Sequence, residues 1–183
     1  MNNDERAVLT KSQRINYWNP QKLYYSIAKK HQRNWTLKRG EVYFVDLGEN
    51  IGSEENKIRP IVVIQSNSYN FTSPVFIGAI ISTSPLTIND IQVPITNHYA
   101  YIDNEGNNKN LTGAIDLGQI KTIAKERIVS KKICKLQNEI ENIDLKLSKV
   151  LGFNLLINKK DNQIKSLSGK VDYLKKQIDD LKK

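Results

Sequence analysis

The sequence is poor in the residues that build disulfides, zinc sites and redox centres. Its 183 residues include one cysteine and two histidines. No internal disulfide and no cysteine-rich metal site can therefore form. The histidines, His31 and His98, lie far apart in the sequence and neither has the spacing of a metal ligand. We expect a protein that uses no metal and no other cofactor.

Long apolar runs are also missing. No stretch approaches the roughly 20 apolar residues that cross a bilayer, and residues 1–20 contain no hydrophobic signal core. The content of 39% apolar and 26% charged residues is typical of a globular chain. These features predict a cytoplasmic protein with no membrane partner, made of one domain with appendages.

Charge is unevenly distributed along the chain, which has a formal net charge of +9. Residues 1–37 carry +5 and residues 136–183 carry +3, whereas residues 38–135 are nearly neutral at +1. A polyanion such as RNA would be attracted mainly by the ends, with an affinity that depends on salt. For the C-terminal segment, lysines that only keep exposed helices in solution are an equally good explanation.

The first 37 residues have the pattern of a basic helical extension. Asn19 and Pro20 have the order of a helix start, with Asn as the cap and Pro at the first helical position. Rings beside basic groups suit base stacking and phosphate contact, but rings that dock the extension onto the rest of the protein are the favoured alternative. The aromatic residues concerned are Tyr17, Trp18, Tyr25 and Trp35.

From Lys38 the pattern changes to short strands. Predicted strands rich in β-branched residues are EVYFVDLG, RPIVVIQSN, PVFIGAII and LTGAIDLGQIKTI. IQVPI is predicted as an edge strand because Pro94 interrupts it, and the hydrophilic YIDNEGNNKN is predicted as a loop. Short strands with almost no helix predict a mostly β core, built as a closed or partly open barrel.

Helical spacing returns after Ala124. One apolar stripe predicts a helix that packs on the barrel and ends near Gly152: Ile140, Ile143, Leu147 and Val150. A second stripe has an unbroken heptad spacing: Ile164, Leu167, Val171, Leu174, Ile178 and Leu181. Its β-branched residues at a and leucines at d favour a parallel two-stranded coiled coil. The alternatives are that this stripe folds back on its own barrel or binds an acidic partner helix.

The middle of the chain resembles the MazF/PemK toxin endoribonucleases of type II toxin–antitoxin systems. The resemblance begins in LKRGEVYFVDLGENIGSEENKIRPIVVIQSNSYN, with its RGE start, GSE loop and RP pair. It continues through VFIGAIISTSP and LGQIKTIAKERI and ends in ENIDLKLSKVLGF. Each motif alone is weak, but the set in this order is specific. It divides the chain into a basic helical extension (1–37), a toxin-like domain (38–153) and a coiled-coil tail (154–183).

This resemblance implies a small SH3-like barrel of the MazF/PemK/CcdB type that forms a homodimer. It also implies a toxin that cleaves single-stranded RNA sequence-selectively without a metal ion. In the family the 2′-hydroxyl attacks the phosphate, which leaves a 2′,3′-cyclic phosphate and a 5′-hydroxyl. The implied partner is a cognate antitoxin, and the net charge of +9 fits an acidic one.

By position, the resemblance assigns Arg59 to the family's catalytic arginine and Ser82 to the position of a catalytic threonine. A guanidinium suits the charge that develops on phosphate. Gly118 stands where relatives often have an acidic residue, so Glu54 is the best candidate for the base, with His98 as the rival. The other residues assigned to substrate binding are Ser53, Thr83, Gln119 and Lys121.

Each assignment has a structural alternative. Arg59 could only form an ion pair with Glu54 or Glu55, and Ser82 could be a turn residue in Ser-Thr-Ser-Pro. Two other functions are also open. One is a toxin-fold protein that binds gyrase without cleaving anything, and the other is a coiled-coil scaffold with an inactive barrel. Cys134 is expected to be a small buried apolar group.

Overall fold

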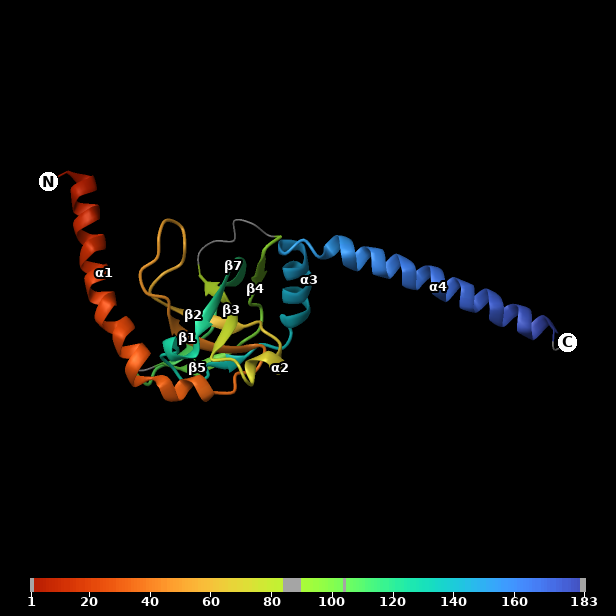
Figure 1. The fold of residues 1–183 in the computed structure, drawn as a ribbon, viewed down its shortest axis with the longest axis horizontal. Coiled ribbons are helices and arrows are strands. Elements are labelled where there is room, and N and C mark those ends of the chain that lie inside the picture. The colour runs from red at the N-terminus through yellow and green to blue at the C-terminus, as the bar shows by residue number, and fades with distance from the viewer. Residues whose placement is uncertain (1, 84–89, 104, 182–183) are drawn as a thin grey trace. The chain divides into compact units, whose positions relative to one another are not determined.

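The computed structural model describes residues 2–83, 90–103 and 105–181 (Figure 1). These residues divide into two compact units, Met1–Lys146 and Leu147–Lys183. The elements in chain order are α1 Asn3–Ala28, η1 Lys30–Asn34, β1 Glu41–Asp46, β2 Ile58–Val63, α2 Asn67–Asn70, β3 Val75–Ser82, β4 Gln92–Pro94, β5 Ala100–Ile102, β6 Asn108–Asn110, β7 Ala114–Ala124, η2 Lys125–Arg127, β8 Cys134–Lys135, α3 Ile140–Val150 and α4 Asn154–Leu181.

Six strands form one antiparallel sheet in the order β4-β7-β3-β2-β1-β8. The longest ladder joins β3 to β7. Directly after β7 the chain reaches the other end of the sheet, where Ile128 bridges Val45 of β1. The sheet is therefore curled into a half-barrel, which confirms the predicted mostly β core. β4, with Pro94, lies at the sheet edge as expected.

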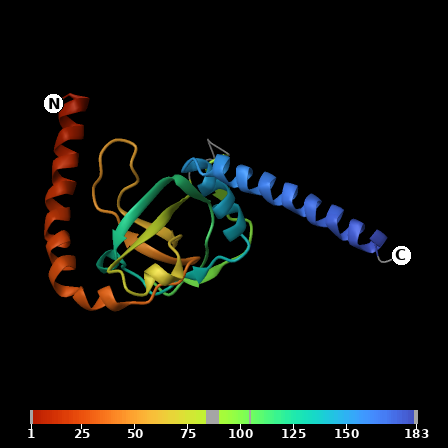
Figure 2. The same ribbon diagram turned by 45° about the vertical axis from the view of Figure 1, so that its right-hand side comes forward.

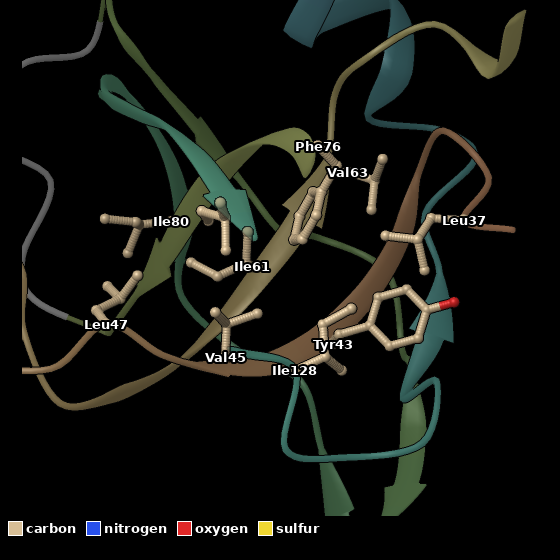
Figure 3. Close-up of a cluster of buried hydrophobic side chains, with 10 residues drawn as sticks. Leu37, Tyr43, Val45, Leu47, Ile61, Val63, Phe76, Ile80 and Ile128 are labelled. Carbon is tan, nitrogen blue, oxygen red and sulfur yellow. The ribbon is translucent and has the colours of Figure 1, made fainter. Parts of the chain in front are cut away.

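Apolar side chains fill the inside of this curl (Figure 3). None is more than 7% exposed, and the set consists of Leu37, Tyr43, Val45, Leu47, Ile61, Val63, Phe76, Ile80, Ile123 and Ile128. Burying a side chain of this size contributes about 1.5–3 kcal/mol. Strand residues alternate between the two faces, yet Val42 and Val62, on the opposite face, are also fully buried. Burial on both faces explains why the second half of β2, residues 61–63, is a continuous apolar run.

Within the segment YIDNEGNNKN, residues 101–102 of β5 pair with residues 108–109 of β6, so the prediction of a loop there is wrong. Its strand residues are mostly exposed, and the sequence therefore lacks the apolar alternation that reveals a strand. The Asp103 carboxylate holds the turn by accepting hydrogen bonds from the backbone N–H groups of Glu105, at 2.9 Å, and Asn107, at 2.8 Å.

Helix α1 begins at Asn3, and Pro20 lies inside it. The prediction of a helix start at Asn19 and Pro20 is therefore wrong. The observed start is a capping box, in which the Asn2 side chain accepts the Glu5 N–H at 2.8 Å and the Glu5 carboxylate accepts the Asn2 N–H at 2.9 Å. Proline inside a helix removes a backbone hydrogen bond, so contacts with the half-barrel on both sides of Pro20 must stabilise the helix.

Those contacts come from two of the aromatic residues. The Trp18 ring packs so closely on Gly48 that a side chain at position 48 would overlap it, and the Arg127 guanidinium lies 5.2 Å from the Trp18 ring centre. The Tyr25 hydroxyl donates to the Asp46 carboxylate at 2.8 Å. For Trp18 and Tyr25, docking of the extension onto the half-barrel is thus confirmed.

A buried lysine also holds the extension. Lys125, directly after β7, is fully buried. Its ammonium group donates to the backbone carbonyls of Trp35, at 2.6 Å, and Asn70, at 2.9 Å. Burial lowers the pKa of Lys125 below its usual range. The hydrogen bonds to these carbonyls replace those that the ammonium group loses when it leaves water. They also connect the end of the extension to the half-barrel.

The C-terminal unit contains the end of α3 and all of α4. Gly152 ends α3 with a φ of +76°. Its N–H donates to the Lys149 carbonyl at 3.0 Å, and the Phe153 N–H donates to the Ser148 carbonyl at 2.7 Å. This pair of bonds is a Schellman motif, which confirms the predicted helix end at Gly152. Along α4 the six residues of the heptad seam are 49% to 87% exposed, so the chain alone does not cover them.

We predict that the exposed seam pairs with the same seam of a second chain. Leu174→Cys, at a d position, should then form an inter-chain disulfide rapidly, whereas Lys176→Cys, at the outer f position, should not. Burial raises the pKa of the native Cys134 thiol to about 11, so it should compete poorly. Non-reducing electrophoresis measures the rates. Equal rates for the two variants, in protein shown to be dimeric, would contradict a parallel pair.

Candidate functional site

A loop extends from the sheet between β1 and β2 (Figure 2). It carries two of the predicted site residues, Ser53 and Glu54. We call residues 47–57 the β1–β2 loop. Its stem is closed by two backbone hydrogen bonds of 2.8 Å, from Leu47 N–H to the Lys57 carbonyl and from Lys57 N–H to the Gly48 carbonyl. Lys57 has a φ of +62°, which costs a non-glycine residue about 1–2 kcal/mol.

Opposite this loop, strand β7 contains a three-residue bulge. Ala79 of β3 pairs with Ile120 of β7, but the next residue of β3, Ile80, pairs with Asp116. Residues 117–119 are therefore inserted between two adjacent pairs. A bulge turns side chains out of the regular alternation of a strand and is common beside functional sites.

Side chains from β7 hold the β1–β2 loop in place. The Gln119 amide accepts a hydrogen bond from the Glu55 N–H at 2.8 Å and donates to the Ser53 carbonyl at 3.3 Å. The Lys121 ammonium group forms an ion pair with Glu54 at 2.8 Å. The Glu54 side chain is 59% exposed, so this ion pair adds at most about 1 kcal/mol to stability and can open at low cost.

The loop and the bulge enclose a groove of about 490 Å³, which we call the first groove. It is lined by Ile51, Ser53, Glu54, Gly118, Gln119, Ile120 and Lys121. Four of the seven predicted site residues are thus brought together. Ser53 and Glu54 come from the loop, and Gln119 and Lys121 come from β7, more than 60 residues later in the chain. Polar and charged side chains thus line this open depression together with Ile51 and Ile120.

Arg59 lies on β2 beside the β1–β2 loop. Its alternation with Ile61 and Val63 places it on the inner face of the curl, at the end of the strand. The Arg59 Nε donates to the Glu55 carboxylate at 2.9 Å, and the side chain is 40% exposed. Its two terminal nitrogens make no hydrogen bond to any residue that the structure describes. Arg59 is therefore oriented by Glu55 but can still bind a ligand.

Ser82 and Thr83 lie at the end of β3 and do not belong to the lining of the first groove. The β2–β3 register pairs Ile61 with Ile80. If this register continued by two residues, Ser82 would lie opposite Arg59. Residues 84–89, which include the rest of the predicted Ser-Thr-Ser-Pro turn, lie outside the described part of the chain.

Asp116 is a candidate that the sequence analysis missed. Its carboxylate accepts the Gly118 N–H at 2.9 Å. A side chain added at Gly118 would contact Ile91 at 2.8 Å and this carboxylate at 3.1 Å. Position 118, where the resemblance places an acidic group, is therefore a glycine beside the Asp116 carboxylate, and Asp116 itself does not line the first groove. The contact is local, because an Asp side chain can accept the N–H two residues on, and the acidic residue two positions before Gly118 was the available signal.

Within residues 2–83, 90–103 and 105–181, no three His, Cys, Asp or Glu side chains are placed to hold a metal ion. His98, the rival base, is exposed and does not line the first groove. None of the helices in this part of the chain is long and apolar enough to cross a membrane.

Known proteins resemble this chain over the half-barrel. The family profile of the PemK-like, MazF-like toxins of type II toxin–antitoxin systems matches residues 38–151. Endoribonuclease MazF of Staphylococcus epidermidis is 31% identical over 118 residues, which cover 64% of this chain and 93% of that protein.

Two crystal structures from Deinococcus radiodurans share the fold. MazF (Form I) aligns with a TM-score of 0.51 and 14% identity, over 64% of this chain and 98% of that one. A chain of the MazE–MazF structure (Form II) aligns with a TM-score of 0.50 and 13% identity, over 64% of this chain and 97% of that one. These matches support the curled, mostly β architecture.

We predict that Gln119→Ala releases the β1–β2 loop without unfolding the half-barrel. The change removes two hydrogen bonds, each worth about 0.5–1.5 kcal/mol, so the loop should open about 5- to 150-fold more often. Digestion with a glutamate-specific protease, followed by mass spectrometry, should show faster cleavage after Glu54 and Glu55. Gln163→Ala, on the exposed surface of α4, is the control. Unchanged cleavage of the loop in Gln119→Ala would contradict this role.

Proposed function

Because the chain belongs to the PemK-like, MazF-like toxin family of type II toxin–antitoxin systems, we propose that it is an endoribonuclease toxin. Its substrate is single-stranded RNA, cleaved sequence-selectively and without a metal ion. The observation that carries this proposal is the match with Endoribonuclease MazF of Staphylococcus epidermidis over 93% of that protein's length. The family match at 38–151 includes the whole first groove and Arg59.

The proposed reaction is an attack of the RNA 2′-hydroxyl on the adjacent phosphate. The bond from phosphorus to the 5′-oxygen breaks, and the products are a 2′,3′-cyclic phosphate and a 5′-hydroxyl. Three tasks must be performed: the 2′-hydroxyl proton is accepted, the charge on the pentavalent phosphorus is stabilised, and the leaving oxygen is protonated.

Arg59 suits the second task. A guanidinium matches two phosphoryl oxygens with its planar fork. In the structure Glu55 accepts from Nε, while the two terminal nitrogens make no bond to a described residue. The ion pair expected as a structural alternative therefore exists, and its geometry leaves the bidentate edge available. The contact with Glu55 positions this edge in advance of substrate binding.

Glu54 is the proposed base, because it lines the first groove and its carboxylate is largely exposed. Opening of its ion pair would also free Lys121 for an RNA phosphate. Ser53 and Gln119 lie in the same groove and can bind bases or sugars. We assign Ser82 to orienting the attacking hydroxyl and Thr83 to substrate contact. This assignment rests on the family position and on the β2–β3 register.

The same proposal covers assembly and control. We propose an SH3-like closure of the half-barrel and a homodimer strengthened by the α4 seam. A cognate acidic antitoxin would hold the enzyme inactive in the cytoplasm, and the positive net charge supports such a partner. We retain the functional division into extension (1–37), catalytic domain (38–153) and tail (154–183).

Purified protein should cleave a mixed RNA in excess chelator into discrete fragments. Arg59→Ala should lower the rate by about 10²–10³, the usual cost of losing one such electrostatic group. Arg59→Lys should restore little, because a point charge cannot make the bidentate contact. Ser82→Ala should cost less than Arg59→Ala. The rates come from gel analysis of end-labelled RNA.

His98→Ala is the control for the choice of base and should cleave at the normal rate, whereas Glu54→Gln should not. Circular dichroism checks that each variant is folded. Cleavage by Arg59→Ala at the unchanged rate would show that the site is wrong. An unmodified chain that cleaves no RNA would favour a gyrase-binding or scaffold protein instead.

Expression of the unmodified chain without an antitoxin should arrest bacterial growth, because RNA would be cleaved throughout the cell. Expression of Arg59→Ala at the same level should be harmless. Culture density after induction, with immunoblots for soluble protein, measures both. Normal growth with abundant soluble unmodified protein would contradict the toxin proposal.

A further inference from the structure

A second groove lies on the other side of the β1–β2 loop, between this loop and α1. It has a volume of about 610 Å³, and its lining includes Arg14, Tyr17 and Trp18 of α1 and Gly48, Glu49 and Lys57 of the loop. Residues of the β1–β2 loop thus line both grooves. Figures 1 and 2 show α1 beside this loop. Half of the second groove comes from the extension, which lies outside the family match.

The α1 side of the second groove is one face of the helix. Thr10, Arg14 and Tyr17 are spaced four and three residues apart and therefore project from the same side. The Tyr17 side chain is 74% exposed, although an aromatic ring is usually at least half covered. Trp18, next to it, is already packed on Gly48. Tyr17 is therefore an available stacking surface beside a rigid aromatic neighbour.

The accessible charge in the second groove is positive. Asp46 accepts the Tyr25 hydroxyl, and Glu49 is paired with Lys11 at 2.9 Å with only 8% of its side chain exposed. Arg14 and Lys57, in contrast, are exposed. Within the residues that the structure describes, neither of these two side chains makes a hydrogen bond or an ion pair. Two unpaired cations therefore lie on opposite walls of the groove.

The walls of the second groove are held rigidly with respect to each other. Lys11 of α1 also donates to the Asn50 carbonyl at 2.6 Å, in addition to its ion pair with Glu49. Trp18 packs on Gly48 at the base of the loop. A groove whose walls are connected before binding loses little conformational entropy when a ligand enters.

We propose that the second groove is a binding site for single-stranded RNA that flanks the cleaved segment. One base stacks on Tyr17, and the adjacent phosphates bind Arg14 and Lys57. A stacking ring combined with cations spaced along a groove is the common mode of single-strand binding. The inference rests on the proposed ribonuclease function. It assigns to α1 a role in substrate affinity in addition to docking.

The backbone of Lys57 makes a clean test possible. Its left-handed conformation favours glycine. Lys57→Gly therefore removes the charge while relieving backbone strain, so the stem of the loop should not be weakened. Tyr17→Ala and Arg14→Ala change exposed side chains on a helix and should also leave the fold intact.

Binding is measured by fluorescence anisotropy with a labelled 20-nucleotide RNA of mixed sequence, in excess chelator. All its 2′-hydroxyls are methylated, so the RNA cannot be cleaved by 2′-hydroxyl attack. Tyr17→Ala should weaken binding by about 5- to 150-fold, the usual contribution of one stacked base. Arg14→Ala and Lys57→Gly should each lower the slope of log affinity against log salt by about 0.7, which is one phosphate contact.

Matched controls separate local contacts from general effects. Tyr17→Phe keeps the stacking ring and should bind normally. Tyr24→Ala removes another exposed ring of α1, and Lys30→Ala removes one exposed positive charge; neither residue lines the second groove. If the three groove variants bind RNA as tightly as the unmodified protein, or if the controls lose as much affinity, the proposal is wrong.

The same experiments distinguish failure of the second binding site from failure of the proposed ribonuclease function. Cleavage of unmethylated RNA by the unmodified protein, together with unchanged binding in all three variants, would retain the ribonuclease and reject the second site. An unmodified protein that neither binds nor cleaves RNA would reject the proposed function itself, and the second groove would then serve another ligand, such as a peptide.

Discussion

Where β3 pairs with β7, one step along β3 corresponds to four steps along β7, and the three extra residues must leave the regular strand. This bulge frees Gln119 to bind the β1–β2 loop, and Gln119 in turn holds the backbone of Ser53 and Glu55. Glu55 then orients Arg59. The first groove and the proposed phosphate-binding edge of Arg59 therefore depend on one irregularity in a strand. Without it, β7 would only be a regular wall of the half-barrel.

The β1–β2 loop is held from two directions. On one side it contacts β7 through Gln119 and Lys121, and on the other it contacts α1 through Lys11 and Trp18. The second set of contacts belongs to a segment outside the family match. The extension is itself attached through Tyr25 and through carbonyls bound to the buried Lys125. A loop with a positive φ at Lys57 thus obtains its order from neighbours rather than from its own sequence.

The strands could be predicted from local pattern because their residues alternate or form short apolar runs that burial requires. The same reasoning failed at β5 and β6, whose exposed polar residues carry no such pattern. It also failed at Pro20, where local preference favours a helix start. There the tertiary contacts of Trp18 and Tyr25 stabilise a continuous helix and outweigh the local preference for a helix start at Pro20.

The sequence by itself determined the mostly β core, the helix end at Gly152, and the membership of Ser53, Glu54, Gln119 and Lys121 in one group, because the order of motifs carried the resemblance. Only the tertiary structure decided how these residues meet and that α1 forms a second groove with the β1–β2 loop. The reason is physical. Strand and helix periods act over a few residues, whereas the bulge and the docking contacts depend on partners more than 20 residues away in the chain, which no local pattern encodes.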